Sequence, residues 1–186
     1  GGGSIAAYMG SLGVSLATMV ANLSSHKRGW DNRWKEFSDW AAKGQAYKDT
    51  LLHLVDEDTI AFNKIMSALS LPKSTEEEKV NRTNAIQSAT KYATEIPFRV
   101  MQTTFASMEV IKAMAEIGNP NSVSDAGVGA LAARSAVMGA YLNVKINAAG
   151  LSDKTFAKTI IAEGAIIQEK TQQLEAEILL VVNGKI

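Results

Sequence analysis

Hydrophobic residues recur at helical spacing along most of this chain of 186 residues. Between residues 86 and 100, one stripe consists of Ile86, Ala89, Ala93, Ile96 and Val100. Steps of three and four place such residues on one face of an α-helix, and that face must be buried against a neighbour. No stretch shows the strict alternation of a β-strand. The pattern therefore predicts an all-helical protein.

Turn and cap signals divide the pattern into about five long helices. Pro72 ends one helix, and Ser74 with Glu77 or Thr75 with Glu78 forms a capping box that begins the next. Pro97 lies inside that next helix, where we expect a kink. The predicted helices are residues 5–25 with Ser4 as N-cap, 32–71 with a break near Gly44, 75–117, 124–149 and 152–183.

Long helices joined by short connections favour antiparallel neighbours, so we expect a single domain over residues 1–186, folded as an up-and-down bundle. The first and fourth helices are apolar around more of their surface than one stripe requires. They are either central or covered by a second subunit. We favour a homodimer that associates through helix faces.

The composition excludes several classes of function. Nineteen basic and nineteen acidic residues give zero net charge, which excludes a strongly basic nucleic-acid binder. The chain has no Cys and only two His, so we expect no metal centre and no redox cofactor. Residues 5–23 carry no charge and are long enough to span a membrane. Their Ser, Thr, Asn and Gly content favours a buried helix instead, in a cytoplasmic protein without a membrane partner.

One carboxylate interrupts the apolar face of the second helix. Asp58 occupies the helical position between Val55 and Phe62. A carboxylate at such a position is costly unless it is paired or hydrogen-bonded. Asp58 either pairs with a basic residue across the bundle or stands in a cleft as a functional group.

Two basic residues near the second turn are candidates for binding an anion. Arg82 extends the apolar stripe of the third helix and is either the partner of Asp58 or a clamp for a ligand anion. Lys73 precedes a helix N-terminus, where a cation is unfavourable unless an anion binds there.

The fourth helix carries two amides one turn apart, Asn143 and Asn147, on a face of small residues. Such amides either bridge helices or read the edge of a heteroaromatic ligand. At the start of this helix Ser124 and Asp125 form a cap, and Asp125 is also a candidate general acid or base.

Four residues at the start of the chain, Gly1, Gly2, Gly3 and Ser4, lead directly into a helix. Successive glycine N–H groups at a helix N-terminus can cradle an anion or a carbonyl oxygen. No Gly-Lys-Ser/Thr follows, so this is not a P-loop.

Taken in order along the chain, these segments resemble the cyclodeaminase part of formiminotransferase-cyclodeaminase and the related cyclodeaminase/cyclohydrolase family. The resemblance rests on an ordered set of short motifs that spans nearly the whole chain. These are Gly1 to Ala7, Leu54 to Asp58 with Ala61 and Phe62, Leu71 to Lys73 with Glu77 to Lys79, Arg82 and Thr83, Gly118 and Asn119, Ser124 and Asp125, and Gly139 to Val144 with Ile146 and Asn147.

The resemblance implies a dimeric helical enzyme that acts on a tetrahydrofolate derivative. The substrate would be 5-formimidoyltetrahydrofolate, and the products 5,10-methenyltetrahydrofolate and ammonia, in histidine degradation and one-carbon metabolism. Asp58 and Asp125 would be the catalytic acid and base, in an order the residues leave open. The binding residues would be Gly1, Gly2, Gly3, Ser4, Lys73, Arg82, Ser124, Asn143 and Asn147.

The chain differs from the family's usual pattern in two ways, and two other functions are alternatives to the cyclodeaminase reaction. Family members usually have a further helix before the glycine motif, so we expect this chain to be a shortened view of the domain. A formiminotransferase would be a separate polypeptide. The first rival function is a methenyltetrahydrofolate cyclohydrolase, and the second is a helical dimer that binds folate without turnover.

Overall fold

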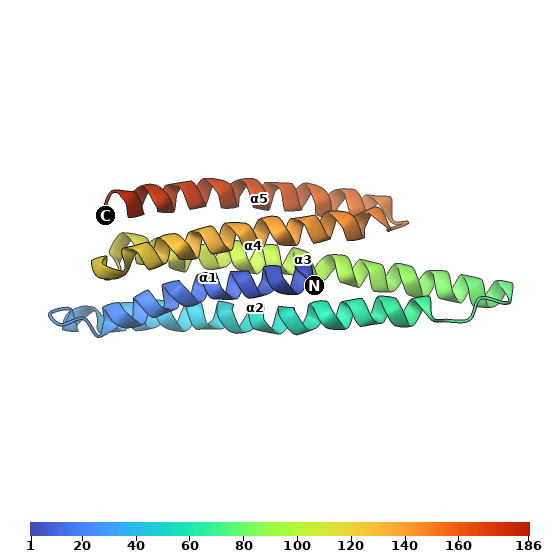
Figure 1. The fold of residues 1–186 in the computed structure, drawn as a ribbon, viewed down its shortest axis with the longest axis horizontal. Helices are drawn as coiled ribbons and strands as arrows, with labels where there is room; N and C mark the ends of the chain where they lie inside the picture. Colours follow the sequence, from blue (N-terminus) through green and yellow to red (C-terminus); the bar gives the residue numbers. More distant parts are fainter.

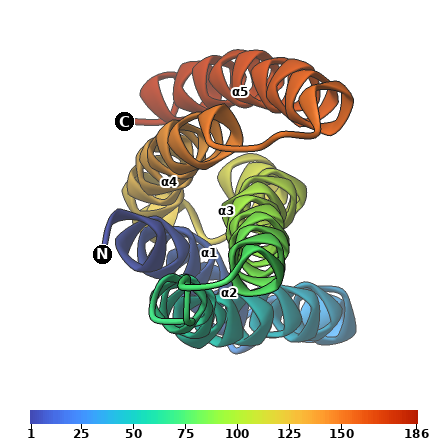
Figure 2. The same ribbon diagram turned by 90° about the vertical axis from the view of Figure 1, so that its right-hand side faces the viewer.

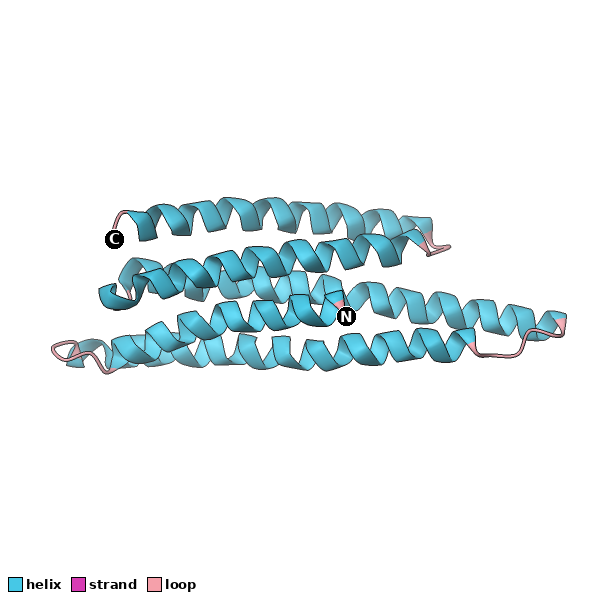
Figure 3. Ribbon diagram, viewed as in Figure 1, coloured by secondary structure: helices cyan, strands magenta, loops and turns pink.

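A computed structural model describes all residues from Gly1 to Ile186. It contains five long helices and two short 3-10 turns, with no strand. In order these are α1 (Gly2–Ser25), η1 (Asp31–Arg33), α2 (Trp34–Leu69), α3 (Glu76–Ile117), η2 (Pro120–Ser122), α4 (Val123–Ala149) and α5 (Lys154–Asn183). The all-helical prediction is confirmed (Figure 3).

Successive helices run in opposite directions, as expected for an up-and-down bundle (Figure 1). The central helices α1 and α4 pack against each other; α1 also packs on α2, and α4 also on α3 and α5. The hairpin of α2 and α3 projects beyond the other helices at the end that carries Lys73 (Figure 1). The first turn of α1 therefore meets α2 at Asp58, eleven residues before the end of that helix.

Two apolar clusters fill the interior of the bundle. One surrounds Leu51, Val100 and Val144, and the other surrounds Phe37, Met108 and Ile178. The helix α1 is long and apolar enough to cross a membrane by length and composition, and here it packs against three other helices of the bundle.

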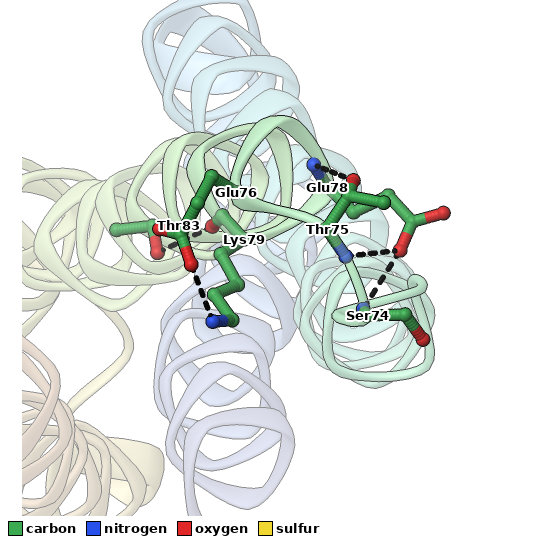
Figure 4. A network of polar contacts seen from close by, with 6 residues as sticks. All are labelled: Ser74, Thr75, Glu76, Glu78, Lys79 and Thr83. Carbon is green, nitrogen blue, oxygen red and sulfur yellow. Dashed lines mark hydrogen bonds and ion pairs between the residues drawn. The ribbon is translucent and has the colours of Figure 1, made fainter.

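The start of α3 confirms the predicted capping box in one of its two forms. The Thr75 hydroxyl accepts the Glu78 N–H, and the Glu78 carboxylate accepts the N–H groups of Thr75 and Ser74 (Figure 4). These bonds satisfy donors at the helix end that have no partner within the helix. The helix then continues unbroken through Pro97 to Ile117.

Three local predictions are wrong. Ser4 is not the N-cap of α1, because the helix begins at Gly2. The second long helix is not broken at Gly44, where the missing side chain makes room for Thr18 of α1. Ser124 is not the cap of α4, since that helix begins one residue earlier at Val123.

Candidate functional site

Four helices meet around a cavity of about 360 Å³ at the first turn of α1. Most of its polar lining comes from residues that the sequence singled out. The lining residues are Gly1, Gly2, Gly3, Ser4, Asp58, Thr59, Ala61, Phe62, Ile65, Ala93, Asn143 and Asn147. We call this space the four-helix cavity.

Asp58 is held in the cavity by a hydroxyl rather than by a basic residue. The Ser4 hydroxyl donates to Asp58 Oδ2 at 2.6 Å. Oδ1 of Asp58 lies close to Gly3, where a Cβ atom would overlap with the carboxylate. Glycine at this position is therefore what lets α1 approach the side chain. The carboxylate forms no ion pair, so the cross-bundle pairing with Arg82 is not found.

The two amides of α4 also face the cavity, and each has one N–H group engaged by a backbone carbonyl. Asn143 Nδ2 donates to the Gly139 carbonyl at 2.9 Å, one turn back in its own helix. Asn147 Nδ2 donates to the Ala93 carbonyl of α3 at 2.7 Å. The protein offers no donor to either Oδ1 atom. These oxygens, together with Asp58 Oδ1, remain available to accept hydrogen bonds from a ligand.

The first turn of α1 supplies the opposite polarity. Its backbone N–H groups lie at the positive end of the helix dipole, on the same cavity as Asp58. One side of the cavity can therefore donate to an oxygen or anion. The other side can accept from N–H groups or hold a cation. A small heterocycle with both kinds of edge would match this arrangement.

Two predicted site residues lie at the far end of α4. Asp125 and Ser124 are in its first turn, and neither lines the four-helix cavity. Asp125 precedes Asn143 by eighteen residues, which is about 27 Å along a helix. Within one chain, Asp58 is the carboxylate that the fold brings to the cavity. A catalytic role for Asp125 stays a prediction.

The two predicted cations lie along the projecting hairpin rather than in the cavity. Arg82 donates through Nε and Nη2 to the Leu69 carbonyl, at 3.2 and 3.1 Å, and so closes the end of α2. Leu69 follows Asp58 by eleven residues, or about 16 Å of helix. Lys73 is exposed in the loop beyond it. Their role in binding an anion stays a prediction.

A second hollow lies on the other side of the α2–α3 hairpin and is larger, about 700 Å³. We call it the hairpin groove. Ile60, Lys64, Leu71 and Tyr92 are among its lining residues. Beside it, the Tyr92 hydroxyl donates to Glu57. This bond is the main reason that the pKa of Glu57 is held below its usual range and the pKa of Tyr92 is raised.

Three groups that line the four-helix cavity or bond within it were not singled out from the sequence. Thr59, Ile65 and the carbonyl of Ala93 carried no motif. A signal for the carbonyl does exist, because Pro97 stands four residues after Ala93 and lacks the N–H that would bind it.

Comparisons with known proteins place this geometry in a family. Residues 1–165 match the family described as Formiminotransferase-cyclodeaminase. A methenyltetrahydrofolate cyclohydrolase of Methylorubrum extorquens is 34% identical over all of this chain and 89% of its own length. A formimidoyltransferase-cyclodeaminase of Rattus norvegicus is 35% identical over 92% of this chain. The chain spans only 32% of that rat protein.

A solved structure agrees in fold over nearly the whole chain. The formiminotetrahydrofolate cyclodeaminase of Thermotoga maritima superposes with a TM-score of 0.85 and 27% identity. The match covers 99% of this chain and 88% of the other. The fold, the ordered motifs and these relatives agree, and the chain belongs to the formiminotransferase-cyclodeaminase family.

Proposed function

We propose that this protein is a formimidoyltetrahydrofolate cyclodeaminase, a lyase that converts 5-formimidoyltetrahydrofolate to 5,10-methenyltetrahydrofolate and ammonia. The observation that carries the proposal is the acceptor side of the four-helix cavity, formed by Asp58, Asn143 and Asn147. A formimidoyl group carries N–H donors and gains positive charge when protonated. Free acceptors and one carboxylate suit such a group.

The chemistry requires one proton to move from one nitrogen to another. N10 of the folate attacks the formimidoyl carbon and forms a C–N bond. The formimidoyl nitrogen is protonated at the start, and the N10 proton is then transferred to it; the bond from the carbon to this nitrogen breaks, the nitrogen leaves as ammonia, and the methenyl product keeps the positive charge. Asp58 accepts the N10 proton and donates it to the leaving nitrogen. Ser4 holds the carboxylate in place through its hydrogen bond to Oδ2.

The remaining predicted residues serve the parts of the folate away from the reacting carbon. The N–H groups in the first turn of α1 face the carbonyl edge of the pterin. The glutamate of a folate lies at the far end of a p-aminobenzoyl spacer. Arg82 and Lys73 lie further along the hairpin and bind its carboxylates. In this proposal the reaction belongs to histidine degradation.

A second candidate function is a methenyltetrahydrofolate cyclohydrolase, which opens the same ring with water. The observation that favours it is the cyclohydrolase of Methylorubrum extorquens, which matches this chain along its whole length. The same Asp58 would then accept a proton from the attacking water.

Feeding each folate separately distinguishes the two reactions. The cyclodeaminase proposal predicts that 5-formimidoyltetrahydrofolate yields ammonia and the methenyl product in equal amounts. The cyclohydrolase predicts consumption of the methenyl compound with no ammonia from either folate. Binding of both folates with no turnover of either would contradict both and favour a folate-binding protein.

We further propose that the chain forms a homodimer through α1 and α4. These helices lie side by side along one flank of the bundle (Figure 2). Both expose large apolar side chains at helical spacing on this flank. They are Ile5, Tyr8, Leu12, Met19 and Leu23 on α1, and Val128, Leu131, Leu142 and Ile146 on α4. Light scattering should give twice the mass of one chain, and a Leu12→Asp variant should give the mass of one.

A further inference from the structure

One contact links a helix-interior proline to a side chain of the four-helix cavity. Pro97 is buried inside α3, with helix on both sides. Proline has no backbone N–H, so the carbonyl four residues earlier loses its partner in the helix. That carbonyl belongs to Ala93, a buried residue that lines the cavity. A buried carbonyl without a partner would be unfavourable.

Asn147 supplies the missing donor from another helix. Its Nδ2 donates to the Ala93 carbonyl at 2.7 Å, a good distance for such a bond. The bond fixes which end of the amide points at α3, because only the nitrogen can donate to a carbonyl. Oδ1 accepts nothing from the protein and is left for a ligand in the cavity.

The neighbouring amide shows what Asn147 would do without this partner. Asn143 lies on the same cavity, and its Nδ2 donates to the carbonyl four residues back in α4. Carbonyls inside unbroken helices also accept side-chain donors, as Ile161 does from the Tyr141 hydroxyl, but there the side chain is a second donor beside the backbone N–H of the helix. The Ala93 carbonyl has no such N–H from its own helix, so Asn147 is the donor that satisfies it and ties α4 to α3 at the level of the cavity.

We propose that Pro97 is a positioning residue for the active site: by freeing the Ala93 carbonyl it fixes the Asn147 amide with Oδ1 as an acceptor for a substrate N–H. The consequence for the reaction rests on the proposed function, whereas the orientation of the amide does not. Asn147 contacts the substrate, and Pro97 acts only through Asn147 and the backbone of α3.

The test restores the missing N–H. In Pro97→Ala, residue 97 can donate to the Ala93 carbonyl within α3 and compete with Asn147. We expect kcat/KM to fall by about tenfold, the scale of one hydrogen bond to substrate. The thermal midpoint should stay the same or rise, because a proline leaves a helix interior. Pro120→Ala makes the same chemical change in the short turn before α4, and we expect it to leave kcat/KM unchanged.

A double-mutant cycle separates positioning from a general effect on α3. In an Asn147→Ala background, Pro97→Ala should have almost no further effect on kcat/KM, because the side chain that it positions is gone. Full activity of Pro97→Ala alone, or an equal loss in both backgrounds, would overturn the proposal.

A second readout does not depend on turnover. The side-chain NH₂ signal of Asn147 in an NMR spectrum should be protected from exchange in wild type and in Pro120→Ala, and should move and lose protection in Pro97→Ala. An unchanged signal in Pro97→Ala would overturn the positioning claim. If neither folate is turned over, the proposed function fails, and the amide signal still decides the role of Pro97.

Discussion

The two hollows beside the α2–α3 hairpin differ in a way that volume does not reveal. The hairpin groove is about 700 Å³ and the four-helix cavity about 360 Å³. The groove is lined by α2, α3 and the loop residue Leu71, and its wall is mainly apolar. The cavity takes its wall from four helices, each of which brings a polar group with a defined partner.

Convergence of polar groups from four helices, rather than size, is what makes the four-helix cavity the candidate functional site. A side chain on one helix can choose among rotamers, whereas Asp58 is confined by Ser4 and Gly3 of another helix. Preorganised groups of this kind are what catalysis requires. Beside the groove, by contrast, the Tyr92 hydroxyl and the Glu57 carboxylate are hydrogen-bonded to each other.

Matched carboxylate variants give the largest expected effect. Asp58→Asn removes the carboxylate that we propose as the proton acceptor and should lower kcat by about 100-fold or more. Glu57→Gln, one residue earlier and beside the groove, should change kcat by no more than about twofold. Asp125→Asn tests the catalytic role predicted for that residue, which requires a loss comparable with that of Asp58→Asn. The rate of methenyl formation measures all three variants. Equal losses in Asp58→Asn and Glu57→Gln would contradict the assignment of the reaction to the four-helix cavity rather than to the hairpin groove.

A single added methyl group should have the next largest effect. Gly3→Ala would push against the Asp58 carboxylate and move it, and displacements on this scale cost between about 10-fold and 100-fold in rate. Gly150→Ala is the control, since a Cβ there meets nothing closer than 3.5 Å. Circular dichroism should show both variants folded. Wild-type kinetics in folded Gly3→Ala would show that the close approach of α1 is not needed.

Loss of the Ser4 hydroxyl should have a smaller effect on the same group. Ser4→Ala leaves Asp58 in the cavity but removes its 2.6 Å hydrogen bond, and we expect kcat to fall by about tenfold. Ser15→Ala is a suitable control, because the Ser15 hydroxyl bonds only within α1. A similar loss in both variants would attribute the effect to α1 as a whole.

The smallest effect concerns the groove and depends on pH. The hydrogen bond from Tyr92 holds the pKa of Glu57 below its ordinary value, so its stabilisation is present above that value and is lost as the pH falls. Tyr92→Phe should therefore unfold more easily than wild type at neutral pH. The difference should vanish as the pH falls through the glutamate range, roughly 4. Urea unfolding of both proteins at neutral pH and in the glutamate range measures this. A difference in unfolding free energy that grows in acid would contradict the prediction.

Most of the fold could be predicted because the signals that determine a helix and its ends are local in the sequence. Apolar spacing and caps such as Thr75 with Glu78 lie within a few residues of the boundary they set. The prediction failed at Gly44, where glycine has a role between helices. It makes room for Thr18 of α1, and nothing in the local pattern distinguishes that role from a helix break.

The sequence predicts which residues belong to the candidate site better than it predicts the partners that they contact. Asp58 was found because a charge interrupts an apolar face, and Asn147 because it stands one turn from Asn143 on a face of small residues. Their partners lie 54 residues away in each case, at Ser4 and Ala93. Such pairings depend on how the helices pack. Because packing is not visible in the sequence, the helix face on which Asp125 or Arg82 lies did not show how far each is from the cavity.

The most direct test of the account is a crystal structure of the protein with 5-formyltetrahydrofolate, which carries an oxygen where the proposed substrate carries its leaving nitrogen. The account predicts that the pterin and formyl group occupy the four-helix cavity, within hydrogen-bond distance of Asp58 or Asn147. A folate whose pterin lies in the hairpin groove, with the four-helix cavity empty, would contradict it.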